Sequence, residues 1–165
     1  MDAAAKIGAM PRWRRIAREA SDRAQAVTQG TLATCALARR HGHRTTQILV
    51  VDDDENTLSA THAFLTAEGY AVDVAGHGRE ALYDLRHGIS PRVIVLDFEM
   101  PVMGGFDFRT AQRRDPSIAD IPVIVCSGAP RPRDASTLEI HEWLPKPVDP
   151  VRLLTALHRY VRPSP

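Results

Sequence analysis

Polar side chains that could carry out chemistry follow directly after short apolar runs of this sequence. They are Asp52 and Asp53, then Asp97, and further along Ser127 and Lys146. Carboxylates held close together repel one another unless a cation accompanies them, and Mg²⁺ prefers such hard oxygen ligands. A hydroxyl and an ammonium beside them would supply a hydrogen-bond donor and a compensating charge for a phosphoryl group. The residue types therefore predict a Mg²⁺ site at which phosphoryl transfer occurs.

The lysine of this set is informative because the chain has two lysines and nineteen arginines. Lys146 lies between Pro145 and Pro147, which indicates that a compact charge on a flexible stem is required there. Pro147 is also a candidate for a cis peptide bond. Taken singly, acids after a strand are often helix caps, and we expect Asp54 or Glu55 to cap the helix that follows. The five polar residues together favour a functional site over solvated loops.

The elements that must position these residues begin at residue 47, where short apolar runs alternate with segments of helical periodicity. The expected strands are 48–51, 70–74, 93–96, 123–126 and 140–144. The expected helices are 56–67, 78–87, 105–114 and 150–161, with a proline-broken stretch over 129–139. Such alternation predicts βαβ units and a parallel sheet with helices on both faces. Ligands of such sheets bind outside the carboxyl ends of the strands, which is where the polar residues lie.

The distribution of charge divides the chain into two segments. Residues 1–46 carry nine basic and three acidic residues, a net +6, whereas residues 47–165 carry twelve basic and seventeen acidic residues, a net −5. We expect residues 1–46 to be a basic, Ala/Arg-rich extension, either helical or disordered, and residues 47–162 to be one α/β domain. The acidic balance of that domain argues against a uniformly basic nucleic-acid-binding module.

The cellular setting is predicted from what the sequence lacks. Cys35 and Cys126 are too few for a disulfide framework and lack the spacing of a zinc site. No run approaches the ~18 apolar residues of a membrane span, and the first residues have no apolar signal region. We therefore expect a soluble, cytoplasmic protein with no membrane partner.

The segment from about residue 47 to 161 resembles the receiver domain of bacterial two-component response regulators. Its motifs stand in the order of that family: ILVVDDD at 48–54, AGHGREAL at 75–82, VIVLD at 93–97, MPVMGG at 100–105, CSG at 126–128 and LPKP at 144–147. The resemblance implies a doubly wound, flavodoxin-like sheet of five parallel strands in the order 2-1-3-4-5.

The resemblance also implies a phosphoaspartate. Asp97 would accept a phosphoryl group from a histidine kinase or a histidine phosphotransfer protein, as a step of a phosphorelay. Mg²⁺ would be held by Asp52, Asp53, Asp97 and the backbone carbonyl of Glu99. The protein would be a signalling domain with self-catalysed phosphotransfer and dephosphorylation, not an enzyme acting on a separate substrate.

Three further residues take roles from the resemblance. Ser127 would turn inward to hydrogen-bond the phosphoryl group, and Lys146 would pair with it. Trp143 would occupy the switch aromatic position; the alternative is that it is a core or half-buried strand residue. Phosphorylation adds about −1.5 to −2 charge and would shift the population from an inactive to an active state.

Three features depart from the pattern of the family. The stretch after Ser127 is short and contains Pro130 and Pro132, so we expect the fourth helix to be short, displaced or irregular. Gly128 stands where alanine is more usual. Glu99 adds a carboxylate beside Asp97, and we expect it to alter how fast water attacks the acyl phosphate.

Three functions follow from these observations. The leading hypothesis is a stand-alone response regulator that signals through protein–protein interaction, because four residues follow the last predicted helix. A phosphatase resembling the haloacid dehalogenases is an alternative, since Asp52 and Asp54 permit a nucleophile and a second acid two residues later. Nucleic-acid binding through residues 1–46 is the third, although a solvated or dimerising helix explains that segment more simply. Homodimerisation on phosphorylation stays open.

Overall fold

The computed structural model describes residues 46–162, so the extension predicted for residues 1–46 lies outside the described residues apart from its last position. Five parallel strands form one sheet in the predicted order, β2-β1-β3-β4-β5. The strands are β1 Ile48–Val51, β2 Val72–Ala75, β3 Val93–Asp97, β4 Val123–Ser127 and β5 Glu142–Pro145. The helices are α3 Glu55–Ala67, α4 Gly78–Arg86, α5 Gly105–Arg113 and α6 Pro150–Leu157, with a 3₁₀ helix, η1, over Arg133–Leu138.

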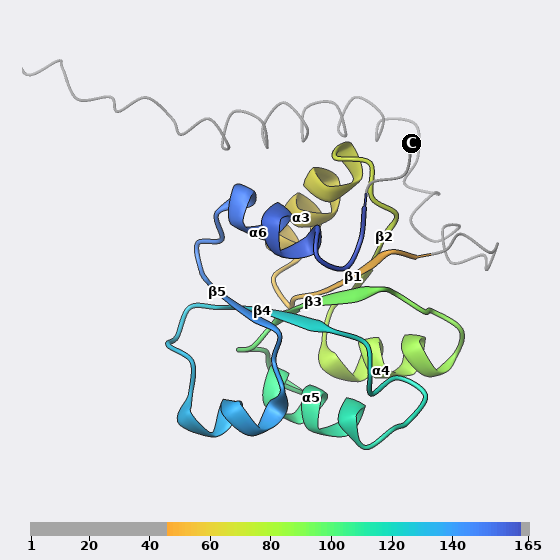
Figure 1. The fold of residues 1–165 in the computed structure, drawn as a ribbon, viewed down its shortest axis with the longest axis vertical. Helices are drawn as coiled ribbons and strands as arrows, with labels where there is room; N and C mark the ends of the chain where they lie inside the picture. The colour runs from red at the N-terminus through yellow and green to blue at the C-terminus, as the bar shows by residue number, and fades with distance from the viewer. Residues whose placement is uncertain (1–45, 163–165) are drawn as a thin grey trace, which may run out of the picture.

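The sheet separates two apolar clusters, because successive side chains of a strand point to opposite faces. Leu49 and Val51 of β1 pack on the face covered by α4 and α5, together with Phe108. Ile48 and Val50 pack on the face covered by α3 and α6. Figure 1 shows these two helical layers on either side of the sheet. Strands β1, β3 and β4 are buried along their whole length, which explains why they are continuous apolar runs.

Side-chain caps fix the beginnings of α3 and α6. The carboxylate of Asp54 accepts the N–H of Thr57 at 2.8 Å, so the predicted cap is confirmed. The carboxylate of Asp149 accepts the N–H groups of Val151 and Arg152 at 2.8 and 3.1 Å. The loops that leave β1 and β5 therefore end at defined places. Within residues 46–162, none of the helices is long and apolar enough to cross a membrane.

The predicted start of β2 and the predicted end of α6 were wrong because helix ends close in turns that periodicity does not reveal. Strand β2 begins at Val72, not at residue 70, since Gly69 (φ 89°) and Tyr70 complete the end of α3, with the Tyr70 N–H donating to the carbonyl of Leu65 at 3.1 Å. Helix α6 ends at Leu157, not at residue 161, because the chain beyond it continues in turns with two N–H groups bonded three residues back.

The fourth helix of the expected fold is replaced by η1, which confirms the prediction of a short or irregular segment. Pro130 and Pro132 precede it, and proline has no N–H to donate to a longer helix. The 3₁₀ helix ends at Leu138, and the next residue, Glu139, has a left-handed φ of 50°. The chain turns there, and β5 begins at Glu142 instead of residue 140.

Two buried polar side chains of α5 hold the end of η1 in place. Nε of Arg109 donates to the carbonyl of Leu138 at 2.9 Å, and Nη2 donates to the carbonyl of Glu139 at 3.3 Å. Gln112 accepts from Arg109 and donates to the carbonyl of Ile118, each at 2.9 Å. Arg109 is 2% exposed, and burial lowers the pKa of its guanidinium. These hydrogen bonds anchor a segment that has little helix of its own.

Candidate functional site

The predicted site residues meet at the carboxyl edge of the sheet. Pairing of β1 with β3 places Val51 beside Leu96, so Asp52 and Asp97 follow two neighbouring strands at the same level. Pairing of β3 with β4 then places Asp97 beside Cys126. The register therefore brings together acids that are 45 positions apart in the sequence.

Lys146, which follows β5, bridges two of these acids. Its Nζ lies 2.9 Å from Oδ2 of Asp52 and 2.8 Å from Oδ2 of Asp97. Both aspartates are buried, whereas the lysine side chain is 28% exposed. Burial raises the pKa of Asp52, and the hydrogen bond from Lys146 opposes that rise. Burial by itself would lower the pKa of Lys146, but its bonds to Asp97 and Asp52 outweigh burial and raise it. The lysine is therefore a charged counterion for both carboxylates.

Three carboxylates gather closely enough to share a cation. Asp52, Asp53 and Asp97 each offer one oxygen, and these oxygens all lie within 4.8 Å of one another. Asp53 is exposed, so the group is open to water on one side. Hard oxygens with an open, hydrated side form the donor set that Mg²⁺ prefers. One ammonium also leaves the negative charge of three carboxylates incompletely balanced, and the residues therefore fit a Mg²⁺ ion.

Glu99 contacts the site through its main chain and its side chain. Its N–H donates to Oδ1 of Asp97 at 3.1 Å, which places the main chain of Glu99 beside that carboxylate. Its own carboxylate oxygen Oε2 accepts the N–H of Gly128 at 3.2 Å. The role of the Glu99 carbonyl as a metal ligand stays a prediction.

The hydroxyl of Ser127 is engaged within its own loop. Ser127 is fully buried, and its Oγ donates to the carbonyl of Ala129 and accepts the N–H of Ala129, both at 3.1 Å. The predicted inward hydrogen bond therefore requires the side chain to exchange these two partners for a phosphoryl oxygen.

Trp143 packs against an aromatic residue that sequence reasoning missed. The ring centroids of Trp143 and Phe98 are 4.9 Å apart and their planes are tilted by 59°. Phe98 directly follows Asp97, and its ring lies where a Cβ added at Gly105 would approach within 2.7 Å. The sequence signal that could have identified Phe98 was an aromatic residue immediately after the strand-end acid Asp97. Contact through Phe98 connects Trp143 to the neighbourhood of Asp97.

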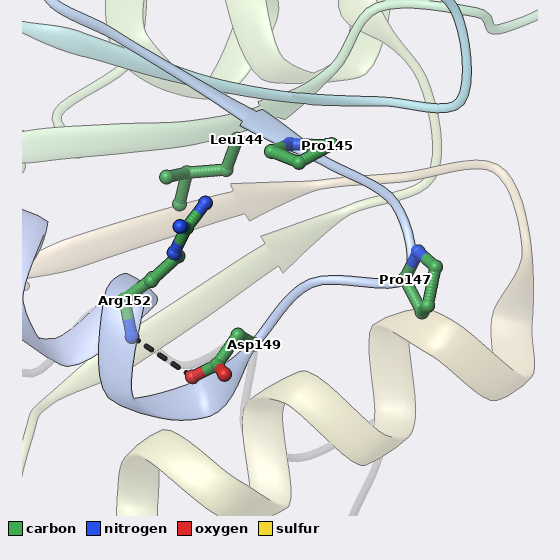
Figure 2. Close-up of a pocket in the computed structure, with 5 residues that line it drawn as sticks. All are labelled: Leu144, Pro145, Pro147, Asp149 and Arg152. Atoms are coloured by element: carbon green, nitrogen blue, oxygen red, sulfur yellow. Dashed lines mark hydrogen bonds between the residues drawn. The ribbon is translucent and has the colours of Figure 1, made fainter.

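A small hollow lies where β5 joins α6, separate from the acidic cluster. It is lined by Leu144, Pro145, Pro147, Asp149 and Arg152. Figure 2 shows the Asp149 carboxylate directed to the backbone of Arg152, the bond that caps α6. The Lys146–Pro147 peptide bond beside it is cis. None of the three site aspartates lines this hollow, so it is not the candidate site.

Comparison with known proteins places this geometry in a family. The family model for the response regulator receiver domain matches residues 48–158. An uncharacterized 14.6 kDa protein of Leptolyngbya boryana is 35% identical over 116 residues, which cover 68% of this chain and 88% of that protein. The response regulator SaeR of Staphylococcus aureus is 29% identical over 116 residues, which cover 68% of this chain and 49% of SaeR. The match thus spans about half the length of SaeR.

Solved structures give the same result. The chemotaxis protein CheY4 of Vibrio cholerae superimposes with a TM-score of 0.65 at 31% identity, covering 71% of this chain and 99% of CheY4. A response regulator receiver protein of Pseudomonas putida superimposes with a TM-score of 0.64 at 27% identity, covering 68% of this chain and 95% of that protein.

A doubly wound parallel sheet with acids and a lysine at its carboxyl edge defines an α/β domain of the receiver class. The chain belongs to the response regulator receiver domain family. Receiver domains are the phosphoacceptor signalling domains of two-component systems, and this membership favours the response-regulator hypothesis over the haloacid-dehalogenase-like alternative.

Proposed function

We propose that the domain of residues 47–162 accepts a phosphoryl group on Asp97 from a phosphohistidine of a histidine kinase or a histidine phosphotransfer protein. The phosphorus–nitrogen bond of the phosphohistidine breaks, a phosphorus–oxygen bond to the Asp97 carboxylate forms, and the imidazole leaves as the phosphoryl group is transferred. The 2.8 Å contact between Lys146 and Asp97 at the end of β3 is the observation that carries this proposal.

The hydrogen bonds of Asp97 hold its carboxylate in one orientation. The N–H of Glu99 binds Oδ1 and the ammonium of Lys146 binds Oδ2, so the nucleophile is oriented before a donor arrives. After transfer, Lys146 would balance the added charge of about −1.5 to −2. Ser127 would leave Ala129 and donate its hydroxyl hydrogen to a phosphoryl oxygen.

Asp52, Asp53, Asp97 and the carbonyl of Glu99 would hold Mg²⁺, as the fit of the three carboxylates supports. A bound Mg²⁺ neutralises charge on the oxygens of a transferring phosphoryl group. Burial raises the pKa of Asp52, and the ammonium of Lys146, 2.9 Å away, favours its charged form.

Signalling would follow from a shift in population between two states. Movement of Ser127 toward the phosphoryl group would vacate space near the end of β4, and Trp143, already packed on Phe98, would respond from β5. The output would be a change of surface read by a protein partner in the cytoplasm.

Phosphorylation by a small donor tests this proposal. Radiolabelled acetyl phosphate with Mg²⁺ should label the wild-type protein, and Asp97→Asn should remove the label. Asp107→Asn, which changes an exposed acid in the first turn of α5, is the matched control and should keep it. Labelling that survives Asp97→Asn would contradict the proposal, and steady turnover of p-nitrophenyl phosphate would instead support a hydrolase.

A further inference from the structure

A carboxylate already occupies a hydrogen-bond donor at the mouth of the candidate site. Glu99 stands two residues after Asp97, and Gly128 stands two residues after Cys126, the partner of Asp97 in the register of β3 and β4. Glu99 and Gly128 therefore face each other just beyond the strand ends. Oε2 of Glu99 accepts the N–H of Gly128 at 3.2 Å, a contact that we call the Glu99–Gly128 contact.

The glycine makes room for this carboxylate. A Cβ added at Gly128 would lie 3.2 Å from Oε2 of Glu99, tighter than nine in ten real Cβ contacts. The backbone of Gly128 does not explain the glycine, because among residues 46–162 the glycines with positive φ are Gly69 and Gly88. A side chain at position 128 would therefore require the Glu99 carboxylate to shift by a few tenths of an ångström.

An anion at this N–H competes with the phosphoryl group that the proposed function brings. Phosphoryl oxygens are bound by backbone N–H groups and by cations, and the Gly128 N–H lies beside the strand pair that ends in Asp97. A carboxylate oxygen of Glu99 holds this N–H, and Glu99 stands two residues after Asp97. A phosphoryl oxygen would have to compete with Glu99 for this N–H.

We infer that the carboxylate of Glu99 occupies the Gly128 N–H in the unphosphorylated protein and is displaced by the phosphoryl group. The inference rests on the proposed function, because it concerns how the site takes up its phosphoryl group. Because the carboxylate must leave the N–H first, it lowers the affinity of the site for a phosphoryl oxygen. Phosphorylation then moves the Glu99 side chain.

Binding of beryllofluoride, a non-covalent phosphoryl analogue, measures this competition. Isothermal titration calorimetry with Mg²⁺ would compare wild type, Glu99→Ala, Glu99→Gln and Gly128→Ala. Loss of the competing hydrogen bond should tighten binding to Glu99→Ala roughly two- to tenfold. Gly128→Ala should also tighten binding, because its Cβ moves the carboxylate away without changing any charge. The affinity of Glu99→Gln for beryllofluoride should lie between those of wild type and Glu99→Ala, because glutamine keeps an acceptor oxygen.

Glu55→Gln is the matched control for charge alone. Glu55 is an exposed acid at the start of α3, and its removal reports the general effect of one less negative charge. Loss of the contact should also shift the Gly128 amide resonance in the NMR spectrum of Glu99→Ala, but not in that of Glu55→Gln.

The outcomes separate the two proposals. Binding to Glu99→Ala no tighter than to Glu55→Gln, or unchanged binding to Gly128→Ala, would overturn the role of Glu99 while leaving the phosphoacceptor intact. Failure of the wild type to bind beryllofluoride in a manner that Asp97→Asn abolishes would overturn the proposed function, and the role of Glu99 with it.

Discussion

Replacement of Lys146 by methionine should destabilise the protein when Mg²⁺ is absent. Lys146→Met keeps the alkyl stem but removes the ammonium that contacts Asp52 and Asp97 at 2.9 and 2.8 Å. Removing one partner of a fully buried ion pair costs about 3–5 kcal/mol. Because 28% of the Lys146 side chain is exposed and water can hydrate the carboxylates it leaves, we expect a discounted loss of about 2 kcal/mol.

A double-mutant cycle in urea, with a chelator present, measures the interaction itself. The cycle compares wild type, Lys146→Met, Asp97→Asn and the double variant. Asp97→Asn removes one of the two carboxylates that Lys146→Met leaves unpaired. The loss of unfolding free energy in the double variant should therefore be smaller than the sum of the two single losses, by about 1 kcal/mol or more. Losses that add within about 0.5 kcal/mol would refute a cluster in which Lys146 pairs with Asp97.

Two further predictions concern the segment between β4 and β5. Arg109→Met should lower the unfolding free energy by about 2–4 kcal/mol, because the carbonyl of Leu138 and Oε1 of Gln112 lose a buried donor. Unchanged stability in urea, together with unchanged hydrogen exchange over residues 133–138, would count against the role of Arg109 as an anchor. Burial, and to a lesser extent the positive charge of Arg109, lowers the pKa of His141 below its ordinary value of 6.5. The unfolded chain then binds the proton more readily, so stability is complete above pH 6.5 and falls as the pH decreases toward the folded pKa. His141→Asn should remove that part of the pH dependence of urea unfolding, and identical profiles for both proteins would contradict it.

The sheet and the set of site residues could be predicted from the sequence because they depend on local patterns. Continuous apolar runs identify strands buried on both faces, and alternation with helical segments makes them parallel. Parallel strands then place all their carboxyl ends at one edge, and the strand order implied by the family resemblance makes the strands that end before Asp52 and at Asp97 neighbours.

The contacts that refine the site depend on packing between distant positions. Glu99 and Gly128 are 29 positions apart, as are Arg109 and Leu138, and no local pattern relates either pair. The aromatic contact of Trp143 likewise required a partner from another strand end. Element boundaries at β2 and α6 were wrong for a related reason, since a turn at a helix end is set by individual backbone hydrogen bonds.

Identification of the phosphorylated residue tests the central claim most directly. After transfer from a phosphohistidine donor, borohydride reduction of the acyl phosphate converts the modified aspartate to homoserine, which mass spectrometry of peptides can locate. We predict that the conversion occurs at Asp97 alone. Conversion at Asp52, the position that a haloacid-dehalogenase-like mechanism would use, or the absence of any conversion, would contradict the assignment of Asp97 as the phosphoacceptor.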